Sequence, residues 1–174
     1  FTQFQAIDAR RAFPGFDEPR FKTPFEVSVV AHAGDRVITN APLAQTTPGP
    51  GDRVTHAFEP TLPLPTYLMA FAVGPLDIVA ATVPANSVRR TPLPLRGVAT
   101  RGKARELAYA LEHTPAIVQQ LETYFDSPYP YPKLDLIASP QMGGAMENAG
   151  AIIFNDTLLL LDAASPPAQQ GAFY

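Results

Sequence analysis

The sequence contains no cysteine and only three histidines among its 174 residues. Without cysteine, neither a disulfide framework nor a thiolate metal site is possible, and the cellular compartment stays open because many secreted proteins also lack cysteine. No apolar stretch approaches the roughly 20 residues that a helix needs to cross a bilayer. We therefore expect no membrane span in this chain and assign no localisation.

The chain also lacks a large excess of either positive or negative charge. The 13 lysines and arginines nearly balance the 16 aspartates and glutamates, which leaves a net charge of -3 at pH 7. Nucleic acids and anionic membranes are bound by clustered lysine and arginine, so the composition predicts no nucleic-acid partner. At 46% hydrophobic residues, the chain can bury a core and fits one domain or parts of two.

The two ends of the chain lack the usual marks of a complete protein. Phe1 is not an initiator methionine, and no closing structural element precedes Tyr174. We therefore expect the chain to be a piece of a longer protein, from which any signal peptide has been lost.

The first 98 residues are predicted to form short strands in an antiparallel sheet or sandwich. Many of the 20 prolines fall in this part, where they disfavour helices and central strands. The candidate strands are the alternating or apolar runs 25–32, 54–58, 67–73 and 76–83, with a turn at 47–52.

Helical spacing replaces this pattern from residue 101 to residue 125. Pro115 interrupts it, so either one helix kinks there or Thr114 caps a second helix with Pro115 at its first position. An extended linker at 127–132 and strands at 134–138 and 151–154 follow. We therefore place a boundary near residue 98, between an all-β part and an α+β part.

The segment from Met142 to Gly150 stands out chemically. Gly143 and Gly144 let the backbone approach a ligand without a Cβ atom in the way. A strand-like run follows at 151–154. An edge strand of this kind could pair with an extended peptide, with Glu147 placed to meet a charged amine. The alternative, a glycine-rich turn with an exposed glutamate, is favoured when only local physics is considered.

Three sequence blocks resemble the aminopeptidase N family of zinc peptidases, in that family's order. Gly144 to Asn148 reads GAMEN, which is similar to the family's exopeptidase signature. The opening residues, 2–6 and 8–19, and the segment Tyr129 to Asp135 resemble two further blocks. The resemblance covers the full length of the chain.

This resemblance implies a mostly β fold with a smaller α+β part. Residues 1–98 would belong to a saddle-like, N-terminal β-sandwich domain. Residues 99–174 would begin a thermolysin-like catalytic domain and stop before its zinc helix.

The resemblance also implies roles for the GAMEN residues in binding a peptide with a free N-terminus. Glu147 would bind the substrate's α-amino group, and the backbone of Gly144 and Ala145 would align the peptide. Met146 and Asn148 complete the substrate-binding segment.

A second amine-binding residue is implied at Gln5, in the opening block. Most members have glutamate at this position, so Gln5 is a departure that weakens the charge pairing. The resemblance further suggests a cis peptide bond between Gln5 and Ala6.

The acidic pair in the opening block is better explained by structure than by catalysis. Asp17 and Glu18 are adjacent, so in an extended segment their side chains point apart and make a poor acid–base pair. We expect Arg10 and Arg11 to pair with these carboxylates in a structural network.

The residues for zinc chemistry are not in this chain. A hydrolytic zinc needs three protein ligands and an open position, which the family takes from H-E-x-x-H and a later glutamate. His32, His56 and His113 have no second histidine four positions away. We therefore expect zinc in the full-length parent, no metal ligand or catalytic residue in this chain, and H-E-x-x-H soon after Tyr174.

The leading interpretation is the substrate-binding portion of a zinc aminopeptidase that is inactive as a fragment. One alternative is a zinc-less scaffold relative used for protein–protein interaction, which would have no reason to keep GAMEN intact. Another is a free-standing β-sandwich binding module, which the helical and GAMEN segments fit poorly.

The purified chain should therefore bind no stoichiometric zinc and cleave no aminoacyl substrate, because its histidine spacing cannot build a tetrahedral site. Metal analysis of the chain tests this directly, and one tightly held zinc per molecule would contradict it. Sequencing of the gene beyond Tyr174 tests the matching expectation that H-E-x-x-H follows.

Overall fold

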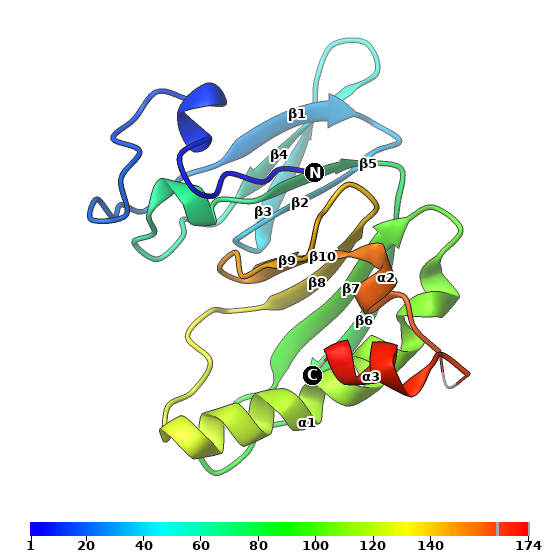
Figure 1. The fold of residues 1–174 in the computed structure, drawn as a ribbon. Helices are drawn as coiled ribbons and strands as arrows, with labels where there is room; N and C mark the ends of the chain where they lie inside the picture. The colour runs from blue at the N-terminus through cyan, green and yellow to red at the C-terminus, as the bar shows by residue number, and fades with distance from the viewer. Residues whose placement is uncertain (163, 174) are drawn as a thin grey trace. The chain divides into compact units, whose positions relative to one another are not determined.

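The computed structural model describes residues 1–162 and 164–173 (Figure 1). The chain folds as two compact units. The first consists of Phe1–Leu76 and Met146–Ala151, and the second of Asp77–Ala145 and the described residues from Ile152 onward. The predicted mostly β fold is confirmed, since strands outweigh helices in the described residues. The predicted domain boundary near residue 98 stays a prediction.

Two small antiparallel sheets form the frame of the first unit. One has the strand order β1–β4–β3, and the other pairs β2 with β5. Their bounds are β1 Ser28–His32, β2 Arg36–Thr39, β3 Leu43–Pro48, β4 Arg53–Phe58 and β5 Phe71–Gly74, with 3₁₀ turns η1 at Ala9–Arg11 and η2 at Thr66–Leu68. Buried Ala31, Val37, Ala41 and Phe58 form its core cluster, which fits the predicted alternation in 25–32.

The apolar run 67–73 is a partial error of the sequence prediction. Its first residues lie in η2, and the strand begins only at Phe71. Met69 and Ala70 are each 1% exposed, so the run is apolar because it is buried and not because it is one strand. The Asn40 side chain, and not a neighbouring strand, binds the backbone of Leu68 and Ala70.

A mixed sheet with the strand order β6–β7–β8–β10–β9 organises the rest of the chain (Figure 1). The strands are β6 Leu76–Val83, β7 Leu93–Thr100, β8 Leu134–Ser139, β9 Ala145–Met146 and β10 Ala151–Asn155. β7 and β8 are parallel, and Leu95 lies opposite Leu134. A parallel pair needs a crossover, which η3 (Ala104–Leu107) and α1 (Ala108–Phe125) provide. Helices α2 (Asp156–Leu159) and α3 (Pro167–Phe173) follow.

Helix α1 runs unbroken through Pro115. The hydroxyl of Thr114 donates to the Ala110 carbonyl at 2.6 Å, four residues back, so Thr114 does not cap a second helix. The two-helix alternative is therefore wrong. Packing explains the continuity, because Ala110, Leu111 and Val118 belong to the buried core of the second unit. In the described residues, no helix is both long and apolar enough to cross a membrane.

A buried ion pair between Arg89 and Glu122 lies near the end of α1, in the second unit. Glu122 accepts hydrogen bonds from Arg89 Nε at 2.8 Å, from Asn86 Nδ2 at 2.6 Å and from the Tyr129 amide at 2.9 Å. The side chains of Arg89 and Glu122 are only 7% and 3% exposed. Burial alone would raise the pKa of Glu122, but the bonds from Tyr129, Arg89 and Asn86 prevail and hold that pKa below its usual value.

Glu122→Gln should lower the free energy of unfolding by about 3 kcal/mol, because it leaves the Arg89 guanidinium buried without a counter-charge. The matched control is Glu18→Gln, which breaks the exposed pair with Arg20 and should cost about 0–1 kcal/mol. Denaturant unfolding of both variants at neutral pH measures the difference. Because the folded pKa is depressed, the contribution of Glu122 should be lost as the pH falls below about 4.5. Equal losses in the two variants would contradict this role.

Candidate functional site

Burial alternates along the GAMEN segment. Ala145 and Glu147 are exposed, whereas Met146 is 0% and Asn148 2% exposed. β9 lies at the end of the strand order, so it is an edge strand. The run 151–154, which the sequence suggested as the edge strand, is β10 and lies between β8 and β9. In the described part of the chain, the Glu147 carboxylate has no hydrogen-bond or ion-pair partner. The segment thus carries a free carboxylate between two buried side chains.

A tight turn follows Glu147. The amide of Ala151 donates to the Asn148 carbonyl at 3.0 Å. Gly150 has φ +69°, the left-handed conformation that a type II turn needs at its third position. The Asn148 amide donates to the Met146 carbonyl at 3.4 Å. Asn148 and Met146, both buried, therefore stabilise the segment from within.

The glycine end of the segment is held within the second unit by Asn155, at the end of β10. The Asn155 amide nitrogen donates to the Gly144 carbonyl, and its side-chain amide donates to the Met142 carbonyl. The Asn155 side-chain oxygen also accepts a bond from Thr157 and so caps α2. Gly143 remains exposed and Gly144 half-buried, so the backbone stays open at both glycines.

Gln5 lies in the first unit with its side chain exposed. The peptide bond between Gln5 and Ala6 is cis, which confirms the expectation for this bond. The preceding residue, Phe4, is 6% exposed and makes edge-on ring contacts with Phe13 and Phe71. An anchored aromatic ring therefore fixes the backbone from which Gln5 projects.

The acidic pair is structural in the first unit, partly as expected. Arg10 binds Asp17 through its backbone amide and its Nε, at 3.1 and 3.0 Å. The Thr66 hydroxyl donates to Asp17 at 2.5 Å, and this bond is the main reason that the pKa of Asp17 lies below its usual value. Glu18 points outward to Arg20.

The prediction for Arg11 was wrong. Its guanidinium lies 3.4 Å from the Asp8 carboxylate and does not pair with Asp17 or Glu18. Arg11 and Asp8 are three residues apart around η1, which brings their side chains to the same side of the turn.

The described residues do not fit a zinc site. No group of three or more histidine, cysteine, aspartate or glutamate side chains gathers among them. His32 lies on β1, His56 on β4 and His113 on α1.

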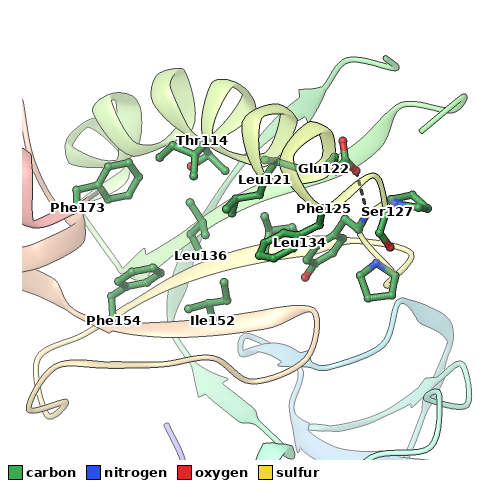
Figure 2. Close-up of a pocket in the computed structure, with 15 residues that line it drawn as sticks. Thr114, Leu121, Glu122, Phe125, Ser127, Leu134, Leu136, Ile152, Phe154 and Phe173 are labelled. Atoms are coloured by element: carbon green, nitrogen blue, oxygen red, sulfur yellow. Dashed lines mark hydrogen bonds between the residues drawn. The ribbon is translucent and has the colours of Figure 1, made fainter. Parts of the chain in front are cut away.

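An apolar cavity of about 420 Å³ lies in the second unit (Figure 2). Figure 2 shows side chains of α1, β8 and β10 facing it, with Phe173 at one end. Glu122 is its charged lining residue, and this carboxylate is already engaged with Arg89. A site that binds a charged peptide terminus needs a free opposite charge, so this cavity is a poor candidate for one.

Comparison with known proteins gives the family. The model of the "Peptidase M1 N-terminal domain" matches residues 1–68, which include Gln5. The model of the "Peptidase family M1 domain" matches residues 109–172, which include the GAMEN segment. The chain belongs to the M1 peptidase family.

Named relatives in this family are aminopeptidases. "Probable aminopeptidase 1" of Sulfurisphaera tokodaii is 34% identical over 97% of this chain and 21% of its own length. "Endoplasmic reticulum aminopeptidase 2" of Bos taurus is 37% identical over 92% of this chain and 16% of its own. "Aminopeptidase N" of Acetobacter pasteurianus is 34% identical, and the match covers 92% of this chain and 44% of the relative. The M1 chain therefore spans less than half the length of these relatives.

The strands β2, β3 and β7 of this M1 chain were not predicted from its sequence, and neither were two sets of side-chain interactions. One is the pair of asparagines, Asn40 and Asn155, that bind the backbone on either side of Glu147. The other is a buried ionic cluster at the start of β8, in which Arg96 binds both oxygens of Asp135 at 2.7 and 2.6 Å. Lys133 donates to the same carboxylate at 2.7 Å. Burial lowers the pKa of Lys133 to about 8, against the opposing attraction of Asp135.

The titration of Lys133 should make stability depend on pH between about 8 and 10.5. In this window the folded chain has released the proton that the unfolded chain still binds, so the free energy of unfolding should rise with pH. The rise should be on the order of 2 kcal/mol relative to Lys133→Met, since one pKa unit corresponds to about 1.4 kcal/mol. Denaturant unfolding from pH 7 to 10, with Lys103→Met as the partly exposed control, measures it. Parallel stability curves for wild type and Lys133→Met would contradict the shift.

Proposed function

We propose that the whole protein removes N-terminal amino acids from peptides and that residues of this chain bind the free N-terminus of the substrate. The observation that carries the proposal is the exposed carboxylate of Glu147, which has no partner among the described residues and lies between buried side chains. The aminopeptidase names of the relatives support the same activity.

The charge of the substrate explains why a carboxylate is needed. A peptide's ammonium group loses water when it enters a closed groove, and an unpaired buried ion is expensive. Glu147 can provide the opposite charge without first breaking another interaction. Gln5 can offer only a neutral carbonyl oxygen, so we assign it the weaker, secondary contact with the amine.

The edge position of β9 suits an extended peptide. An edge strand has unpaired backbone groups that can add a further strand, and this is a common way to bind peptides. Under the proposal, the backbone of Gly144 and Ala145 aligns the peptide, while Met146 and Asn148 keep the segment in place. The open backbone at the glycines supports this role.

Under the proposal, the groups that cleave the peptide bond lie outside this chain. The ligands for zinc and the catalytic groups would come from the remainder of the protein, so the chain alone would bind substrate without cleaving it. In a scaffold relative, nothing would require Glu147 to be exposed and without a partner among the described residues. We therefore favour the enzyme interpretation over the scaffold interpretation.

In the full-length enzyme, Glu147→Ala should lower kcat/KM for free-amine substrates about tenfold to 100-fold, because a hydrogen bond to a charged group contributes about 1.5–3 kcal/mol. Gln5→Ala should cost less, at about 1 kcal/mol for a neutral bond. Neither variant should change the slow cleavage of N-acetylated peptides. Steady-state kinetics of both variants test this, with the exposed Glu59→Ala as control. An unchanged preference for free amines in Glu147→Ala would refute the assigned role.

A further inference from the structure

Asn40 is a buried polar residue directly after β2, in the first unit. It is 4% exposed and lies between Thr39 and Ala41, which are also buried. Its side-chain amide nitrogen donates to the carbonyls of Leu68 and Ala149, each at 2.8 Å. Its side-chain oxygen accepts the amide of Ala70 at 2.8 Å. Both donors of the amide group and its carbonyl oxygen are therefore in use.

The bond to Ala149 reaches the turn that follows Glu147. Ala149 and Gly150 are the two central residues of the turn closed between Asn148 and Ala151. The Ala149 carbonyl therefore belongs to the central peptide of the turn, whose orientation distinguishes one turn type from another. Asn40 and Ala149 are 109 positions apart in the sequence. This bond therefore connects the turn directly after the GAMEN residues to the β2–β5 part of the first unit.

The geometry requires an asparagine. Aspartate has the same shape but, when ionised, it has no donor and would place its oxygens against two carbonyls. Alanine would leave the Leu68 and Ala149 carbonyls and the Ala70 amide without their partner. Serine has only one hydroxyl donor, so it cannot bind both carbonyls.

We infer that Asn40 is a positioning residue for substrate binding: by fixing the Ala149 carbonyl, it holds the backbone that presents Glu147 to the peptide's amine. The inference rests on the proposed function, because it assumes that Glu147 binds this amine. Asn40 itself is buried and contacts no substrate. Under this inference its effect passes through Glu147, which separates it from a general role in stability.

A double-mutant cycle in the full-length enzyme tests this separation. Asn40→Ala and Asn40→Asp are each made alone and together with Glu147→Ala. In the otherwise wild-type enzyme, each should raise KM for a free-amine aminoacyl substrate about tenfold and change kcat by less than about twofold. In the Glu147→Ala background, the same changes should shift KM by less than about twofold.

The matched control is Asn86→Ala, in the second unit. Asn86 also makes three side-chain bonds, one to Glu122 and two with the amides of Val88 and Arg89. Its loss should lower the unfolding midpoint and leave KM unchanged. If the alanine and aspartate variants of Asn40 fail to fold, Asn40→Ser, which keeps one donor, enters the same cycle with the same expected result.

Three results would overturn the inference. A folded Asn40 variant with unchanged KM would do so, and so would an equal rise in KM with and without Glu147, because the latter shows a merely structural role. If Glu147→Ala itself leaves kcat/KM for free-amine substrates unchanged, the proposed function fails and the role of Asn40 falls with it. The single variants thus distinguish the failure of the inference from the failure of the function.

Discussion

The bond from Asn40 to the Ala149 carbonyl is the constraint on which the candidate site depends. On either side of the turn at Ala149 and Gly150, Ala145 and Ile152 belong to the second unit. The intervening residues belong to the first unit, where Asn40 holds the turn at Ala149 and Gly150. Met146 and Asn148 are buried, and Glu147 is left exposed between them. A free carboxylate on a fixed backbone is what amine recognition requires.

The charged residues of the chain fall into two groups with different partners. The carboxylates of Asp17, Glu122 and Asp135 are buried, and each is bound by an arginine. Such pairs belong to the structure, since loss of one member leaves a buried charge behind. Glu147 differs from all three because it is exposed and has no partner among the described residues. This contrast separates Glu147, the carboxylate that we propose for amine recognition, from the structural ones.

Local pattern predicted the elements whose side chains repeat with a clear period. β6 matches the predicted run 76–83, and β8 and β10 match 134–138 and 151–154 to within one residue. The GAMEN letters pointed to the segment of the candidate site. The sequence could not reveal the bond from Asn40, because a contact between residues 109 positions apart leaves no local pattern. Of the two alternatives at Pro115, the break into two helices is wrong, because the core packing of α1 outweighs the local cost of proline.

The central claim is that Glu147 binds the free α-amino group of a peptide. A crystal structure of the whole protein with a bound amino-acid or peptide inhibitor that carries a free α-amine tests it most directly. We predict that the amine nitrogen lies within about 3.2 Å of a Glu147 carboxylate oxygen, the range of a hydrogen bond. An inhibitor whose amine is bound by other groups, with Glu147 still facing solvent, would contradict the claim.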